Sequence, residues 1–420
     1  KEAEVSLRKA IELNPDYVEA HSNLGALLKD LNKLKEAEVS LRKAITLNLS
    51  FAEAYYNLGI LLIDLGRLQE AEVTLCKAIE ISPDLAMAYN AISLLKYSDN
   101  NQIWHNQLFS KSILNNKSPK EQVDIYFARA NILHRKKDYK NSAKNLKLAN
   151  NIKLNLYPSN ANTLINKSSN LIIESDKKQS IQTELTNYPE SIFIVGMPRS
   201  GTTLLESILS MRNDVFDLGE INFLEESFIE FKQSKQEINL ADLYSKKIDY
   251  KTKLNITTNK WLYNYQYAGI IASQIFNAKI IHCYRNPLDN ILSIYRAHFA
   301  KGNEYSSSLV DCANVYLNQE EIMRNYKKRF RSKIYDFNYD SLVKNPCKEI
   351  KSLISWLGWE WNDSYLTPHL NSRSVSTRSN IEVRSPINSK SIGGWKNYKD
   401  MLKPAIDIIT QTERYRDLIL

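Results

Sequence analysis

One stretch, residues 191–209, constrains the fold of this 420-residue chain more than any other. It begins with the apolar, β-branched run 192–195, which is typical of a strand covered on both faces. Gly196 and Gly201 then interrupt the pattern, and apolar residues recur with helical spacing over 203–211. This order predicts an α/β domain with a loop at a helix N-terminus, where free backbone N–H groups favour an anion such as phosphate.

The loop departs from a nucleoside-triphosphate-binding loop at one position. Gly196 and Gly201 have the G-x-x-x-x-G spacing, but Thr202 stands where a lysine would reach the β- and γ-phosphates. A cation comes earlier, at Arg199, and a second hydroxyl follows at Thr203. We therefore expect no triphosphate hydrolysis and an anion that needs no metal. An ordinary glycine turn between strand and helix is the alternative.

The sequence Pro-Arg-Ser-Gly-Thr-Thr after a strand resembles the 5′-phosphosulfate-binding loop of the sulfotransferase superfamily, whose donor is 3′-phosphoadenosine 5′-phosphosulfate. The resemblance implies a P-loop-like domain that transfers a sulfuryl group without a metal. It also implies that the donor contacts the whole loop: Pro198, Arg199, Ser200, Gly201, Thr202 and Thr203.

A second anion-binding element is expected after the apolar strand 279–284. A nucleoside triphosphatase usually places a metal-binding Asp at the end of such a strand, but this chain has Arg285, with Ser293 one helix later. The two side chains can hold one phosphate together. In sulfotransferases such a pair binds the 3′-phosphate of the donor. A small-molecule or nucleotide kinase, the rival enzyme class, is disfavoured by Thr202 and Arg285.

Two catalytic roles follow from the resemblance alone. Glu220, in the segment Asp-Leu-Gly-Glu, matches the Gly-Glu of tyrosylprotein sulfotransferases and their bacterial repeat-containing relatives, where it is the general base. Lys260 matches the Asn-Lys of the family and, with Arg199, would stabilise charge on the transferring group. Without the resemblance, Glu220 is a helix-start carboxylate and Lys260 a surface lysine.

The segment from 377 to 398 is polar, basic and poor in regular structure, and it resembles the lid of sulfotransferases. Tyr339, after the expected strand 333–337, is a candidate for the adenine or an ordinary core aromatic. The weaker donor-binding candidates in the lid are Ser379, Arg384, Lys390 and Gly394. Tyrosylprotein sulfotransferases carry a basic residue where this chain has Ala297, and their cysteine pairing is not evident, so tyrosine as the acceptor is not established.

The first part of the chain is a repeat array. Residues 2–11 recur at 36–45 and, with two changes, at 70–79, a period of 34 residues. This is the tetratricopeptide period, with two antiparallel helices per unit. Asn23 and Asn57 occupy equivalent positions, like the Asn ladder in the repeats of the O-linked N-acetylglucosamine transferase, which holds a peptide backbone. Hydrogen bonding between helices is the alternative for these residues, and oligomerisation or docking for the whole array.

These patterns predict a multidomain protein: tetratricopeptide repeats over 1–98, a degenerate helical repeat over 99–155, a linker over 156–189, and a sulfotransferase domain over 190–420. The first part is an all-α solenoid. The last part alternates strands with helices, which predicts a central parallel sheet covered on both faces.

Composition excludes some classes of function. The net charge of +9 is too diffuse for a nucleic-acid footprint, and no DNA- or RNA-recognition motif is present. The four cysteines lack metal-ligand spacing and suggest no disulfide framework, which favours a reducing compartment and hence the cytoplasm. No apolar stretch reaches transmembrane length. The chain begins at Lys1 within a repeat, so we expect a fragment, and an upstream segment stays open.

The sequence as a whole predicts sulfuryl transfer from 3′-phosphoadenosine 5′-phosphosulfate to an acceptor hydroxyl. A protein tyrosine presented by the repeats is one candidate acceptor. The alternatives are a glycan or small-molecule O-sulfotransferase, and a peptide-binding scaffold that carries an inactive transferase domain.

Overall fold

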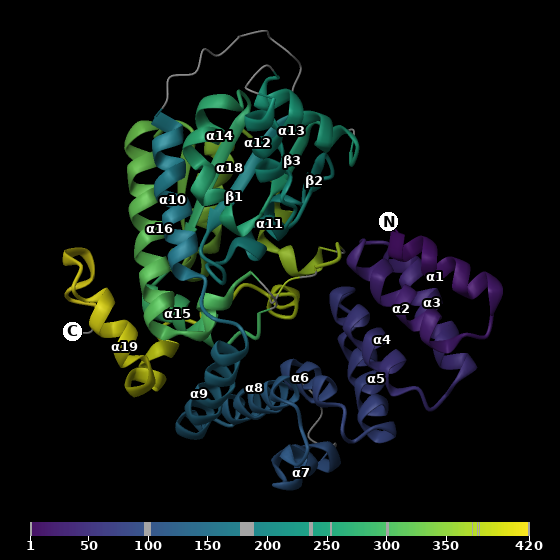
Figure 1. Cartoon of the computed structure of the whole chain (residues 1–420). Coiled ribbons are helices and arrows are strands. Elements are labelled where there is room, and N and C mark those ends of the chain that lie inside the picture. Colours follow the sequence, from purple (N-terminus) through teal and green to yellow (C-terminus); the bar gives the residue numbers. More distant parts are fainter. Residues whose placement is uncertain are drawn as a thin grey trace. The chain divides into compact units, whose positions relative to one another are not determined.

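The structure is a computed structural model that describes residues 2–95, 102–176, 189–234, 238–252, 254–299, 302–371, 373–375, 377 and 379–418 (Figure 1). The chain forms two compact units. The first consists of Lys1–Tyr157 with Ser372–Glu382, and the second of Pro158–Asn371 with Val383–Leu420. The expected boundary between 98 and 99 lies outside the described residues, as does the part of the expected linker from 177 to 188.

The first unit is the expected helical repeat array. Its helices run in antiparallel pairs, and small and branched apolar residues such as Ala37, Leu41 and Ala44 are completely buried between them. The degenerate pair is also helical, and its first helix begins with a capping box formed by Ser118 and Glu121. The helices are α1 (Glu2–Leu13), α2 (Val18–Asp30), α3 (Leu34–Leu47), α4 (Ala52–Asp64), α5 (Leu68–Ile81), α6 (Ala86–Leu94), α7 (Gln102–Phe109), α8 (Pro119–Arg135) and α9 (Tyr139–Leu156).

A short segment from the C-terminal part of the chain also belongs to the first unit. The Val375 backbone N–H donates to the Asp64 carbonyl (3.1 Å), and Asn380 Nδ2 donates to Asp64 Oδ1 (3.0 Å). Ile381 packs against the core of the repeats. The segment Ser372–Glu382 therefore interrupts the second unit in sequence and packs on the helices of the first.

The second unit is built on a five-stranded sheet of order β2-β3-β1-β4-β5, in which every pair is parallel. The strands are β1 (Glu190–Gly196), β2 (Val215–Asp217), β3 (Ile256–Asn259), β4 (Ala278–Tyr284) and β5 (Ile334–Asn338). The expected combination of a repeat solenoid and an α/β domain with a parallel sheet is therefore confirmed. Strand β3 was not predicted, although its run Ile-Thr-Thr is β-branched and fits a short strand.

Helices cover both faces of this sheet. Along β1, Phe193 and Val195 face one hydrophobic core, whereas Ile192 and Ile194 face another, as the period of two requires. The helices are α10 (Ala161–Asp176), α11 (Thr202–Leu209), α12 (Phe223–Gln233), α13 (Leu240–Asp249), α14 (Ala268–Gln274), α15 (Pro287–Tyr295), α16 (Leu309–Arg329), α17 (Tyr339–Lys344), α18 (Pro346–Leu357) and α19 (Lys399–Ile409). None of the helices within the described ranges is long and apolar enough to cross a membrane.

Helix α10, which falls in the expected linker, is packed into the second unit. Gln266 Nε2 donates to the Leu164 carbonyl (3.0 Å) and to Ser168 Oγ (2.9 Å), and all three residues are buried. This part of the chain is therefore a structural helix of the α/β unit.

The strand order places three loops together. The chain leaves β1 toward β2, returns to β3 beside β1, and then continues to β4 on the other side of β1. Strand order reverses at β1, and ligands of open α/β sheets bind at the carboxyl edge of such a switch point. The segments that follow β1, β3 and β4 contain Arg199, Lys260 and Arg285, respectively.

Candidate active site

The loop after β1 has a backbone that requires glycine at two positions. Gly196 has φ +146°, and a Cβ there would lie 2.2 Å from the Cys283 carbonyl oxygen of the neighbouring strand β4. Gly201 has φ +96°, and a Cβ there would lie 2.4 Å from Cδ2 of Tyr339. Arg199 also has a positive φ, +66°, which is costly for a residue with a side chain and is typical of functional loops.

The hydroxyl groups of this loop fit an anionic ligand. Ser200 is 2% exposed, and its Oγ has no hydrogen-bond partner within the described part of the chain. Thr202 and Thr203 are buried and begin α11, where backbone N–H groups lack intrahelical acceptors. A buried hydroxyl without a partner is costly unless a ligand or water satisfies it. The loop is therefore suited to a phosphate- or sulfate-type group.

The two predicted anion-binding elements meet. Arg199 Nε donates to Ser293 Oγ at 3.0 Å, which joins the loop after β1 to helix α15. Asn290, also on α15 and completely buried, donates through Nδ2 to the Pro198 carbonyl at 2.9 Å. Asn290, which fixes the loop against the helix, was not predicted as a site residue.

Arg285 lies beside the same loop and is 6% exposed. Its Nη2 donates to the Ser391 carbonyl (2.9 Å), and its guanidinium lies 4.7 Å from the centre of the Tyr339 ring. Tyr339 Oη in turn is 3.1 Å from Ser391 Oγ. The structure therefore brings together Arg285, Tyr339 and the lid segment, all of which the sequence proposed as donor-binding residues or their neighbours.

Lys260, which looks like a surface lysine in the sequence, is completely buried. Its Nζ donates to Glu220 Oε1 at 2.7 Å, whereas the Glu220 side chain keeps 34% exposure. A second carboxylate, Glu206, lies 3.9 Å from Lys260 Nζ and is 1% exposed. Thr258 Oγ1 donates weakly to this carboxylate (3.4 Å). Glu206 was not predicted; it is the one carboxylate on helix α11, whose other side chains are apolar or carry hydroxyl groups.

Asp289 binds the backbone of the C-terminal part of the expected lid, residues 390–398, which is called the lid from here on. Its Oδ2 accepts from the Gly393 backbone N–H (2.7 Å), and its Oδ1 accepts from the Trp395 backbone N–H (2.9 Å). Burial raises the pKa of Asp289, although these two N–H groups and Arg285 act in the opposite direction. Gly394, a predicted donor-binding residue, lies in this turn. Asp289 itself was not predicted.

Three further residues of the expected lid segment, Arg384, Lys390 and Ser379, were predicted to bind the donor. Arg384 Nη1 donates to the Asn371 carbonyl at 2.6 Å. The Lys390 side chain is exposed. Ser379 belongs to the segment of the first unit, where its N–H donates to Thr377 Oγ1 at 3.2 Å. A donor-binding role for these three residues stays a prediction.

The asparagine ladder of the repeats is not a row of equivalent free amides. Asn57 Nδ2 donates to Ser22 Oγ at 3.1 Å, which links α4 to α2. Asn23 is exposed. For Asn57 the structure therefore shows the alternative noted above, hydrogen bonding between helices, and peptide binding by both residues stays a prediction. Across the ranges that the structure describes, no three His, Cys, Asp or Glu side chains are grouped as metal ligands.

Comparison with known families agrees with this geometry. Residues 189–363 match the model of the sulfotransferase family, and residues 6–39 and 52–85 match tetratricopeptide repeats. The match to the sulfotransferase family covers the strands and most of the helices of the α/β domain. The chain thus combines a sulfotransferase domain with at least two tetratricopeptide repeats.

Individual relatives are more distant. An uncharacterized protein of Aquifex aeolicus is 29% identical over 266 residues, which cover 54% of this chain and 34% of that protein. Protein-tyrosine sulfotransferase 1 of Danio rerio is 24% identical over 231 residues, which cover 49% of this chain and 65% of that protein. The chain therefore spans less than two thirds of the length of either relative.

Solved structures show similar likenesses. The sulfotransferase domain of the Synechococcus PCC 7002 olefin synthase is 17% identical to this chain, with a TM-score of 0.41. The match covers 54% of this chain and 97% of that domain. The tetratricopeptide protein YrrB is 18% identical to this chain, with a TM-score of 0.27. The match covers 41% of this chain and 85% of YrrB.

The Asp289 contacts generate a prediction about the lid. In Asp289→Asn the side chain keeps one acceptor oxygen, so one of the two lid N–H groups loses its partner. We expect the amides of residues 390–398 to exchange hydrogen roughly tenfold faster, the effect of about 1–2 kcal/mol of lost hydrogen bonding. Hydrogen exchange followed by mass spectrometry measures this. The control is Asp400→Asn, which changes an exposed carboxylate in the first turn of α19. Equal hydrogen-exchange rates in the two variants would show that the Asp289 hydrogen bonds do not hold residues 390–398 in place.

Proposed function

We propose that this protein transfers a sulfuryl group from 3′-phosphoadenosine 5′-phosphosulfate to an acceptor hydroxyl. The observation that carries the proposal is the contact of Arg199 Nε with Ser293 Oγ beside buried Arg285. It joins the two predicted anion-binding elements at one edge of the sheet, which suits a donor with phosphate groups on both the 5′ and the 3′ carbon of its ribose. A nucleoside triphosphate would need only one such element and a metal.

The residues of the two elements suit different parts of this donor. The loop Pro198–Thr203 and the N-terminus of α11 would hold the 5′-phosphosulfate through backbone N–H groups, Arg199 and the Ser200 hydroxyl. Arg285 and Ser293 would hold the 3′-phosphate. Tyr339 and the lid around Gly394 would lie against the adenine side. When bound, the donor supplies a sulfuryl group activated by its bond to a phosphate oxygen.

The chain's own residues would then carry the proton and the charge. Glu220 is half-exposed and can turn from Lys260 to an acceptor hydroxyl, whose proton it would take as the new oxygen–sulfur bond forms. Lys260 and Arg199 would stabilise the negative charge that develops on the phosphate oxygen as its bond to sulfur breaks. Positioning of donor and acceptor and stabilisation of this charge would then supply most of the catalysis.

Glu206 completes this arrangement as a positioning residue. When Glu220 turns to the acceptor, Lys260 would otherwise be a buried cation without a partner, which is strongly unfavourable. The Glu206 carboxylate, 3.9 Å from Lys260 Nζ and buried, remains to balance that charge. Lys260 is thus held in place throughout the reaction.

The acceptor belongs to the proposal as well. The name of the Danio rerio relative points to protein tyrosine, and the repeats are a suitable peptide-binding surface, so we propose a peptide or protein hydroxyl as acceptor. Glycan and small-molecule hydroxyls are the alternatives. A scaffold with an inactive transferase domain is disfavoured because Arg199, Glu220 and Lys260 are present and grouped at the strand ends.

The donor is tested by calorimetry with 3′,5′-adenosine bisphosphate against ATP with Mg²⁺. We expect the bisphosphate to bind at least about tenfold more tightly, because Arg285 and Ser293 address a 3′-phosphate that ATP lacks. Arg285→Ala should remove this preference. Arg324→Ala, which changes an exposed arginine on α16, should keep it. Tight binding of ATP with Mg²⁺ and none of the bisphosphate would instead identify a kinase-type site.

The general base is tested with Glu220→Gln. This variant should bind 3′,5′-adenosine bisphosphate like the unmodified protein but lose turnover by about 10²- to 10⁴-fold, the usual contribution of a catalytic base. Turnover is measured as transfer of label from the donor into a fractionated lysate, which also shows whether protein, glycan, lipid or small molecules take the label. Glu226→Gln, on the exposed side of α12, is the matched control. Near-normal turnover in Glu220→Gln would exclude it as the base.

The positioning role of Glu206 predicts a different pattern. Glu206→Gln should lower kcat by roughly tenfold or more, because the buried charge of Lys260 loses its second carboxylate. Glu206→Asp, which keeps the charge, should recover part of the loss. Thermal melting of each variant separates this effect from misfolding. Equal kcat for Gln and Asp variants of the same thermal stability would show that Glu206 is merely structural.

A further inference from the structure

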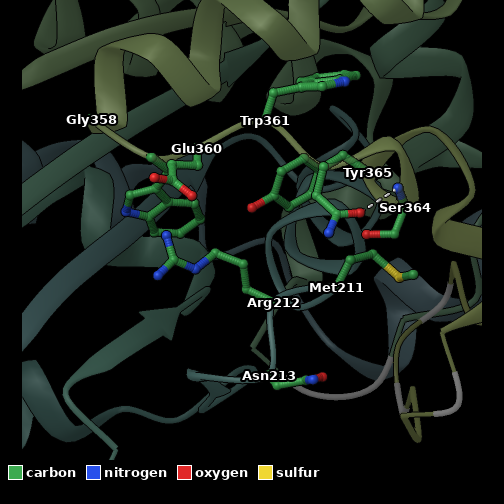
Figure 2. A pocket seen from close by; sticks show the side chains of 10 residues that line it. Met211, Arg212, Asn213, Gly358, Glu360, Trp361, Ser364 and Tyr365 are labelled. Carbon is green, nitrogen blue, oxygen red and sulfur yellow. Dashed lines mark hydrogen bonds between the residues drawn. The ribbon is translucent and has the colours of Figure 1, made fainter.

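A pocket lies in the α/β unit, away from the loops described above. It has a volume of about 460 Å³ and is formed by the segment after α11 and the segment after α18. Figure 2 shows the side chains of Arg212 and Tyr365 pointing into it, with Trp361 at its rim. Its size is within the range of small-molecule sites.

The pocket lies at the opposite edge of the sheet from the donor loop. Met211–Asn213 immediately precede β2, which begins at Val215, so this segment is at the amino edge. Lys279, near the start of β4, donates through Nζ to the Leu357 carbonyl at the end of α18 (2.6 Å). Because all five strands are parallel, the pocket and the carboxyl-edge loops are on opposite edges.

The lining includes three aromatic side chains, Trp359, Trp361 and Tyr365, and both tryptophans already have a cation over one face. The Arg212 guanidinium lies 4.5 Å from the Trp359 ring, and Lys351 Nζ lies 5.0 Å from the Trp361 ring. A cationic ligand would bind such a pocket by placing its charge over the face of an indole ring. These positions are filled by the protein itself, so a cationic ligand is disfavoured.

An anionic ligand is disfavoured as well. Arg212 Nε donates to Asp214 Oδ1 at 2.7 Å, and its Nη2 also pairs with Asp214, so its charge is already balanced. The remaining ionised group of the lining, Glu360, is a carboxylate, and it forms no ion pair or hydrogen bond with other residues that the structure describes. Among the lining residues, an anion would therefore contact Arg212, whose charge Asp214 already balances, and the unpaired carboxylate of Glu360. Lys351 lies over the Trp361 ring and does not line the pocket.

A neutral ligand with apolar faces and many hydroxyls fits what remains. The partly exposed Trp361 ring, whose Nε1 donates to Asp363 Oδ1 (2.8 Å), offers flat apolar surface that suits the C–H face of a sugar ring. Tyr365 is only 1% exposed, so it supports the wall rather than offering a ring face to a ligand. Glu360, Asn213 and Ser364 offer acceptors and donors for hydroxyl groups. We propose that this pocket is a saccharide-binding site, separate from the active site and independent of the proposed function.

The test is saturation-transfer NMR and tryptophan fluorescence titration of the full chain with three neutral trisaccharides, of glucose, N-acetylglucosamine and mannose. We expect at least one to bind, with affinity lowered about tenfold or more by Trp361→Ala and by Glu360→Ala. Glu360 is exposed, so its replacement leaves the fold intact even where Trp361→Ala does not. Glu53→Ala, which removes an exposed carboxylate of α4, should have no effect.

Saturating 3′,5′-adenosine bisphosphate and the Glu220→Gln replacement should leave saccharide binding unchanged, which separates this site from the active site. Binding that is lost in either condition would place the saccharide at the active site and overturn the proposal. The proposal also fails if none of the three trisaccharides binds, if Glu360→Ala binds like the unmodified protein, or if tetramethylammonium or sulfate binds to the pocket in preference to all three.

Discussion

The α/β unit depends on keeping one charge inside the protein. Lys260 is completely buried at the end of β3, and a buried ammonium without partners would cost several kcal/mol. Two carboxylates offset that cost from different places, Glu206 from the helix after β1 and Glu220 from the loop after β2. One is fixed in the interior and the other is partly exposed. This difference lets the exposed carboxylate move without leaving the lysine unbalanced.

Parallel topology explains how residues so distant in sequence come together. The order β2-β3-β1-β4-β5 places β3 and β4 on either side of β1, so that their carboxyl ends form one edge. Arg199, Lys260 and Arg285 each follow a different one of these strands. Buried contacts such as Asn290 Nδ2 to the Pro198 carbonyl then fix the loops relative to the helices. The strand ends set the approximate positions of the loops that carry these side chains, and hydrogen bonds to the loop backbone then fix the loops accurately.

Elements with a local sequence signal could be predicted, whereas contacts between distant residues could not. The glycine-punctuated loop and the 34-residue period each carry a local signal, so the α/β domain and the repeats were predictable. Strand β3 was missed because its two threonines, although β-branched, are polar, so the segment lacks the apolar run that marks a buried strand. Glu206 and Asp289 were missed because their partners, Lys260 and the lid N–H groups, are distant in sequence. Such pairings have no local signal and exist only once the sheet is formed.

The lid and the second anion-binding element share their residues. Arg285 donates to the Ser391 carbonyl, Tyr339 Oη is within hydrogen-bond distance of Ser391 Oγ, and Asp289 accepts from two lid N–H groups. Asp289 and Ser293 lie four residues apart on helix α15, which is about one turn. A ligand that engages Arg285 must therefore act on the contacts that hold the lid. Under the proposed function, binding of a 3′-phosphate would be coupled to the position of the lid through this one short helix, and the lid would take part in donor recognition.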